Sequence, residues 1–153
     1  MAYGDQFSVT TGKLTLTAAA TKSLWLLNPV TNKFRLTYLN VSLDASAAAA
    51  AVQIDIYRVV TIGSAAGTAG SENPLDPSSQ AATTTSLTAL STEPTTVTVL
   101  DSWYVQPLGG LLVIQNPLGR EYVAAAAGAR IGLRYTTAAG VTPDCLATVY
   151  FEE

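Results

Sequence analysis

Apolar side chains recur at every second position along most of this chain. In residues 52–60, for example, Val52, Ile54 and Ile56 alternate with Gln53 and Asp55. A period of two is that of a β-strand with one buried face, whereas an amphipathic helix repeats every 3.6 residues. We expect about eight strands, broken by Gly, Pro, Asn and Asp, from segments at residues 13–17, 22–29, 33–44, 52–60, 85–90, 95–100, 110–117, 129–136 and 145–153.

Two segments depart from simple alternation. The apolar positions of residues 33–44 change parity between Tyr38 and Leu39, which predicts a β-bulge or a strand that changes partners. Residues 110–117 are apolar on both faces, which predicts a central strand. Short strands separated by irregular loops predict an all-β fold: an antiparallel β-sandwich, specifically an eight-stranded jelly roll.

The chain of 153 residues is the size of one domain. We expect the sandwich to occupy residues 13–153 and residues 1–12 to form an extended N-terminal arm, with an ordinary frayed terminus as the alternative. The 23 residues from Gly63 to Thr85 are rich in small side chains, and we expect this segment to cross between the two sheets or over the sandwich edge, stiffened by Pro74 and Pro77.

Charged residues make up only 12% of the chain, about half the usual fraction, so an assembly that covers much of the surface suits this protein. The eight Lys and Arg residues are scattered and the net charge is −3, which argues against partners such as nucleic acid or a membrane surface. Neither a membrane-spanning run nor a signal peptide is recognisable, so we expect synthesis in the cytoplasm. The single cysteine, Cys145, excludes an internal disulfide and fits a small buried side chain.

The absence of histidine removes the common general base and the commonest metal ligand. We therefore expect no catalytic residues, no metal site and no cofactor. Carboxylate-only hydrolysis is the remaining enzymatic alternative, although most acids fall in predicted turns. Glu72, Asn73 and Asp76 have oxygen ligands suited to Ca²⁺ but lack the alternation of a calcium loop.

Several stretches together resemble a known family. They are "FRLTYLNVSLDASAAAAAVQIDIYRV", "GTAGSENPLDPSSQAATTT", "STEPT", "QPLGGLLVIQNPLGREYVAAAAGARIGLRY" and "ATVYFEE". In this order they resemble phage head-associated proteins of the small β-sandwich or jelly-roll kind, which include the decoration (cement) proteins of tailed phages. The resemblance covers residues from about 33 to 153.

The resemblance implies a non-enzymatic protein on the exterior of a virion, made in the host cytoplasm, whose partners are the phage major capsid protein and further copies of itself in a homotrimer. We expect the subunit or capsid interface among Tyr3, Phe7, Glu72, Asn73, Pro74, Leu75, Asp76 and Pro77. The alternative is a carbohydrate-binding jelly-roll module of a phage tail or spike. It would use exposed aromatic rings at Trp25, Trp103 and Tyr104, which would otherwise lie in the sandwich core.

Overall fold

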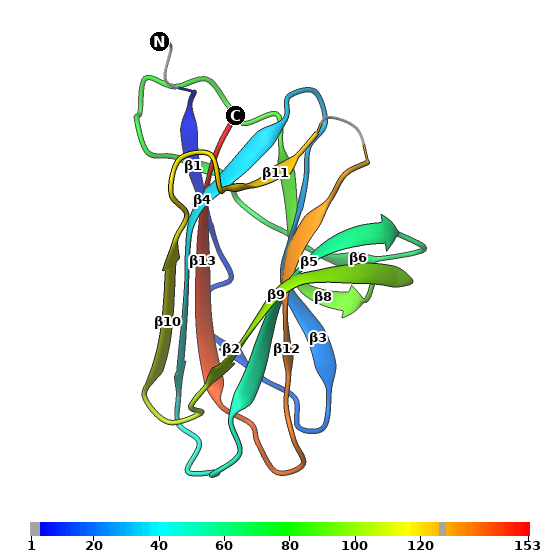
Figure 1. The fold of residues 1–153 in the computed structure, drawn as a ribbon, viewed down its shortest axis with the longest axis vertical. Helices are drawn as coiled ribbons and strands as arrows, with labels where there is room; N and C mark the ends of the chain where they lie inside the picture. The colour runs from blue at the N-terminus through cyan, green and yellow to red at the C-terminus, as the bar shows by residue number, and fades with distance from the viewer. Residues whose placement is uncertain (1–3, 126–127) are drawn as a thin grey trace.

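Two antiparallel sheets pack face to face as a β-sandwich in the computed structural model, which describes residues 4–125 and 128–153 (Figure 1). The described residues form thirteen strands: β1 (Gln6–Thr10), β2 (Leu14–Thr15), β3 (Thr21–Asn28), β4 (Phe34–Asp44), β5 (Val52–Thr61), β6 (Ala66–Ala69), β7 (Asn73–Pro74), β8 (Thr85–Thr92), β9 (Thr96–Val105), β10 (Gly110–Gln115), β11 (Tyr122–Ala124), β12 (Ile131–Thr136) and β13 (Asp144–Glu152). The all-β, two-sheet prediction is therefore confirmed.

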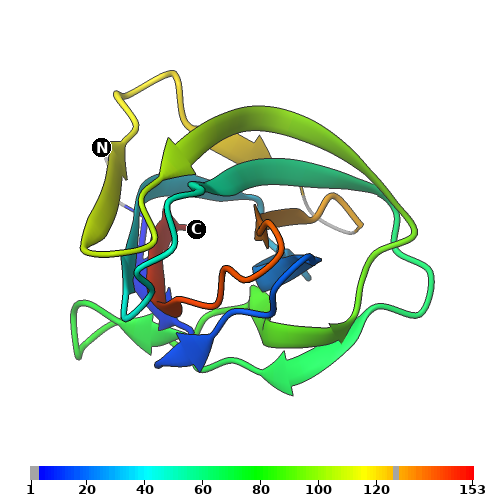
Figure 2. The same cartoon turned by 90° about the horizontal axis from the view of Figure 1, so that it is seen from below.

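The seven-stranded sheet has the order β10-β4-β13-β1-β7, with β11 also on β4 and β2 also on β13. The six-stranded sheet has the order β6-β8-β3-β12-β5-β9. In Figure 2, β5 and β9 run side by side as long curved strands, so this sheet bends around the core. Eight strands remain when β2, β11 and the segment from β6 to β8 are left out. In chain order, the first of these eight pairs with the last, the second with the second-to-last, and so on inward: β1 with β13, β3 with β12, β4 with β10, and β5 with β9.

The main core lies between the sheets and takes the alternate, inward-facing residues of each strand. On β4 these are Phe34 and Leu36, then Leu39, Val41 and Leu43. The predicted change of parity is present, but it lies at Thr37 rather than between Tyr38 and Leu39, because the register of β4 against β13 shifts between Leu36 and Tyr38. An extra residue in one strand turns the following side chains to the other face, which keeps all five apolar residues inside.

A second, smaller apolar cluster lies outside the main core and consists of Leu26, Tyr57, Val59 and Leu90. Tyr57 is fully buried, and its ring lies over Gly132 of the neighbouring strand β12. A Cβ atom at residue 132 would lie 2.4 Å from Cζ of Tyr57. Glycine is therefore required here to make room for the ring.

The segment from Gly63 to Thr85 does cross between the sheets, as predicted. Its first part forms β6 in the six-stranded sheet, β7 then pairs with β1 in the seven-stranded sheet, and the chain returns to β8. The return is fixed by the Glu153 carboxylate, which accepts hydrogen bonds from the backbone N–H and hydroxyl groups of Thr83 and Thr84. The start of β1, the C-terminus and the β7 part of this segment consequently lie at the same end of the sandwich (Figure 1).

Three sequence expectations need correction or refinement. The described residues form thirteen strands rather than about eight, because β6, β7 and β11 are too short to show a period and β1 lies in the segment that was expected to be an arm. Residues 110–115 form β10, which among the described strands pairs only with β4 and is an edge strand rather than a central one. Residues 6–10 of the expected arm form β1, which is hydrogen-bonded between β13 and β7 within the sheet.

Gly132→Ala is expected to lower the free energy of unfolding by about 1–3 kcal/mol, because the new methyl group overpacks the Tyr57 ring. Urea unfolding followed by circular dichroism measures the change. Thr136→Ala, on the same strand and partly exposed, is the control and should stay within about 0.5 kcal/mol of the parent. Equal stability of Gly132→Ala and the parent would show that Tyr57 does not need this space.

Candidate functional site

The most deeply buried acid, Asp55, has a structural environment. Its side chain is only 2% exposed and accepts hydrogen bonds from Oγ of Ser102 (2.6 Å), Nε2 of Gln53 (2.8 Å) and Nε of Arg134 (3.0 Å). Burial acts to raise the pKa of Asp55, but the three hydrogen bonds and the Arg134 charge outweigh it and hold that pKa below its usual value. Asp55 is therefore an ionised, fully satisfied group that no substrate reaches.

A hydroxyl and a carboxylate also meet at Ser23 and Glu93, the combination that could activate a nucleophile. Glu93 accepts hydrogen bonds from the Ser23 backbone N–H and hydroxyl, and the Ser23 hydroxyl lies 2.7 Å from that of Tyr57. Burial raises the pKa of Tyr57 to about 12. Because Ser23 and Tyr57 are both buried, this network ties β3 to β5 and does not present a nucleophile to solvent.

Two carboxylates do share one hollow, at the end of the β4–β13 pair. Asp44 and Asp144 are cross-strand neighbours and line an open hollow of about 310 Å³ together with Lys13. The Lys13 ammonium lies 2.8 Å from Asp144, and the hydrogen bond that it donates lowers the pKa of Asp144. A glycosidase needs one acid with a raised pKa as proton donor. Asp144 lacks that property.

The described residues contain no group of three or more His, Cys, Asp or Glu side chains that could hold a metal ion. Across the same described part of the chain, no helix is long and apolar enough to cross a membrane.

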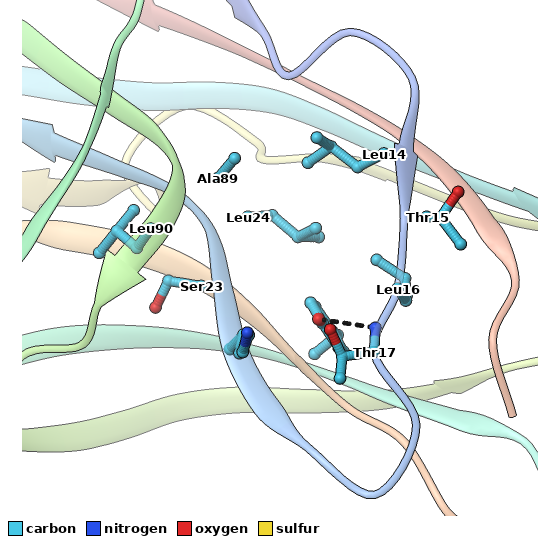
Figure 3. Close-up of a pocket in the computed structure, with 10 residues that line it drawn as sticks. Leu14, Thr15, Leu16, Thr17, Ser23, Leu24, Ala89 and Leu90 are labelled. Carbon is cyan, nitrogen blue, oxygen red and sulfur yellow. Dashed lines mark hydrogen bonds between the residues drawn. The ribbon is translucent and has the colours of Figure 1, made fainter. Parts of the chain in front are cut away.

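A small pocket of about 170 Å³ lies between the β2 segment and the β3–β8 pair (Figure 3). Leu14, Leu16 and Leu24 point into it, and Leu90 lies on its β8 side. Its polar contact is the hydrogen bond from the Thr17 backbone N–H to the Tyr135 hydroxyl, at 3.1 Å. A mainly apolar wall of this size offers room for a small apolar group and no set of catalytic side chains.

The middle of the outer face of the seven-stranded sheet differs from these sites because it is broad and carries no charge. It is made by the outward-facing residues of four neighbouring strands. They are Gln6, Ser8 and Thr10 on β1, Leu146, Thr148 and Tyr150 on β13, Tyr38, Asn40 and Ser42 on β4, and Leu111, Val113 and Gln115 on β10. We call this set the uncharged face. Charged residues border it, with Asp44 and Asp144 at one end and Arg35 and Glu152 at the other.

The uncharged face combines apolar anchors with groups that can form hydrogen bonds. Leu111, Val113 and Leu146 are among the most exposed apolar side chains of the described residues. The rings of Tyr38 and Tyr150 meet edge to face, with centroids 5.3 Å apart, and help to line an open groove of about 330 Å³. Tyrosine with exposed aliphatic residues and no charge is the composition of the centre of a protein–protein interface.

The predicted interface loop lies beside this face. The backbone N–H of Leu75 donates to the Gln6 carbonyl at 2.8 Å, and Leu75 joins the tyrosines in lining the groove. Residues 73–77 are exposed, and Glu72 accepts a hydrogen bond from the Ser86 hydroxyl. Hydrogen bonds from the Ser78 backbone and hydroxyl lower the pKa of Asp76, so this carboxylate stabilises the turn after Pro77.

Phe7 does not belong to an exposed interface. It is buried and stacks on Phe151, with ring centroids 5.5 Å apart, because β1 directs it into the core. Tyr3 lies outside the described residues.

Sequence reasoning missed the uncharged face itself, although its polar and apolar members sit at alternate positions of β4 and β13.

The three aromatic residues proposed for sugar binding do not form one surface. Trp25 is completely buried in the main core, and Trp103 is half-buried and packs against that core. Tyr104 alone is well exposed, at 77%. The exposed ring at Trp25 that the carbohydrate-binding alternative requires is absent, and Trp25 lies in the sandwich core, because the inward parity of β3 places it between the sheets.

Asp55→Asn is expected to lower the free energy of unfolding by about 1–3 kcal/mol at pH 7, because it removes the charge that Arg134 and Ser102 bind. A carboxylate whose pKa is lower in the folded state stabilises the fold at pH values above its pKa in the unfolded chain, which is about 4. This stabilisation is lost as the pH falls through the pKa of the folded state. The deficit of Asp55→Asn should therefore shrink between pH 5 and pH 2, roughly the window of acid protonation. Urea titrations across this range test it, with the exposed Asp44→Asn as control; a deficit independent of pH would contradict the assignment.

No protein-family model, no curated protein and no solved structure matches this chain. The function has to be argued from the residues and the geometry of the site.

Proposed function

We propose that this chain is a non-enzymatic structural protein of a virion that binds the outer surface of an assembled phage capsid and stabilises it. The observation that carries the proposal is the uncharged face, which spans β1, β13, β4 and β10 without a charged side chain. The resemblance of residues 33–153 to phage head-associated proteins, which include the decoration proteins, is the reason for proposing a capsid as the partner.

The chemistry of the face suits a large protein partner. Burying a Lys or Asp side chain without a counter-ion is costly, whereas Ser, Thr and Asn can exchange water for hydrogen bonds with the partner. Leu146 and Val113 would contribute apolar area, and Tyr38 and Tyr150 would act as rigid anchors. A shell subunit that contacts this face need not present any complementary charge.

The rim of the face is stiffened where the predicted loop joins it. Pro74 and Pro77 restrict the backbone on either side of Leu75, and Leu75 is tied to β1 through Gln6. A loop that is already ordered loses little conformational entropy when it binds. Residues 73–77 are therefore suited to extend the contact beyond the sheet.

Stabilisation of the shell follows from mass action. A protein that binds the assembled lattice, and not the separated subunits, shifts the equilibrium toward the assembled particle. This role needs a rigid scaffold and a contact surface, and it needs no turnover.

We also propose that the sandwich is a jelly roll. In that fold a long antiparallel hairpin is rolled so that its first strand pairs with its last and the two sheets share its strands. The pairing of β1 with β13, β3 with β12, β4 with β10 and β5 with β9 supports this topology. The segment from β6 to β8 would then be an insertion between the fourth and fifth strands.

Purified capsids of the phage that encodes this chain should bind it and resist heat better with it than without it. Co-sedimentation measures binding, and the temperature at which the particle releases its genome measures stabilisation. Capsids that neither bind the protein nor gain heat resistance would rule the proposal out.

Leu146→Glu places a charge on the uncharged face, in the row next to Asp44 and Asp144, and should weaken capsid binding by about tenfold or more, which corresponds to about 1.4 kcal/mol. Val60→Glu is the matched control, because Val60 is a similarly exposed residue of the six-stranded sheet. Equal loss of binding in both variants would show that the uncharged face is not the contact.

A further inference from the structure

The edge strand β10 is unusual among the four sheet edges of the described structure. β7 is two residues long and contains Pro74, β6 is interrupted by a register shift, and β9 has two register shifts and contains Asp101. β10 has six residues in unbroken register, with no charge and no proline. It therefore lacks the features that normally prevent an edge strand from pairing with another chain.

The hydrogen-bonding groups of β10 can be assigned to its two sides. The Asn116 backbone N–H donates to the Thr37 carbonyl at 2.9 Å, so residue 116 faces β4. Hydrogen-bonded pairs alternate along an antiparallel ladder, and therefore Leu112 and Ile114 also bond to β4. The N–H and C=O groups of Leu111, Val113 and Gln115 consequently point away from β4 to the free side, where no strand of the described residues pairs with them (Figure 1).

Exposed apolar side chains are concentrated along the same segment. Leu111 is 67% exposed and Val113 is 50% exposed. A Pro-Leu-Gly turn lies at each end of the strand, and the turn leucines Leu108 and Leu118 are 61% and 89% exposed. These two leucines lie five residues before and five residues after Val113.

This spacing makes the edge complementary to itself. If a second β10 runs antiparallel with Val113 opposite Val113, then Leu111 lies opposite Gln115 and the turn leucine Leu108 lies opposite Leu118 of the other copy. The charged residues Arg120 and Glu121 then fall opposite Gln106 and Val105, so no charge opposes another. A surface that matches itself about one point is what an isologous two-fold contact requires.

We propose that two copies of this chain pair through their β10 edges, about a two-fold axis at Val113. The contact joins two seven-stranded sheets into one continuous sheet and satisfies the free backbone groups of Leu111, Val113 and Gln115 in both copies. It also brings the two uncharged faces side by side as one larger surface. The pairing does not depend on capsid binding, and it differs from the homotrimer that the family resemblance implies.

The mass in solution gives the first test. Sedimentation analysis should find twice the 15.9 kDa of one chain. A monomer at all concentrations tested, or a trimer as the smallest species, would overturn the proposal.

Cross-linking locates the axis. In a hydrogen-bonded antiparallel pair the two Cα atoms at residue 113 would lie about 5.5 Å apart, within disulfide range. Val113→Cys should therefore form a disulfide-linked dimer under mild oxidation. Leu146→Cys is the matched control on the same face, since two such residues would be separated by five strand spacings, about 24 Å. The native Cys145 is buried and gives no background. Failure of Val113→Cys to link, or equal linking of both variants, contradicts the axis.

Val113→Pro removes the central outward N–H while leaving the β4 bonds of Leu112 and Ile114 in place, a position where edge strands accept proline. It should convert the dimer to a monomer, whereas Val113→Thr keeps the N–H and should remain dimeric.

Hydrogen exchange of the unmodified protein supplies a test that needs no variant. The amides of Leu111, Val113 and Gln115 should be protected together with those of Leu112 and Ile114, and alternating protection would overturn the proposal.

Discussion

The C-terminal strand β13 is the element on which the rest of the structure depends. It lies in the middle of the seven-stranded sheet, where it pairs with β4 on one side and with β1 and β2 on the other. Its inward residues, Cys145, Ala147, Val149 and Phe151, are buried in the main core. Burial raises the pKa of the Cys145 thiol to about 12, so this side chain fills space and is not reactive. Because β13 lies between β1 and β4, these two strands would not be joined in one sheet without it. Since these pairings join residues from opposite ends of the chain, the sheet can form only after long loops have closed, which predicts slow folding.

The two outer faces of the sandwich use polar residues in different ways. On the six-stranded sheet, the buried Asp55 forms an ion pair with the partly exposed Arg134, and Glu93 holds Ser23 beside Tyr57. These charged groups bind partners within the protein and hold neighbouring strands together. The seven-stranded sheet leaves its outer face to Ser, Thr, Asn, Gln, Tyr and aliphatic residues, with charges only at its two ends. The few charged residues of the sequence thus lie elsewhere and leave this one surface uncharged. A protein partner would pay the lowest desolvation cost by binding there.

Much of the fold was predictable because a strand with one buried face leaves a direct trace in the sequence. Val52, Ile54 and Ile56 alternate with polar residues, and the parity change in residues 33–44 predicted a bulge that the structure places at Thr37, where β4 meets β13. The short strands β7 and β11 leave no such trace, since two or three residues cannot show a period. β10 was misjudged because Leu112 and Ile114 face the core while Leu111 and Val113 face solvent. An exposed apolar residue and a buried one look the same in the sequence. The loop at residues 73–77 was found from its prolines, but Phe7 could be assigned to the core only once its partner strand was known.

The sequence by itself determined the all-β class, the position of the long strands, the absence of histidine chemistry and the poverty of charge, because each of these is a property of composition or of local period. The tertiary structure alone decided which strands are neighbours. That choice made β10 an edge, sealed Ser23 and Asp55 away from solvent, and gathered residues from β1, β4, β10 and β13 into one uncharged face. Strand pairing joins residues more than a hundred positions apart, and its energy depends on how all the side chains fill one shared core. No local pattern carries that information.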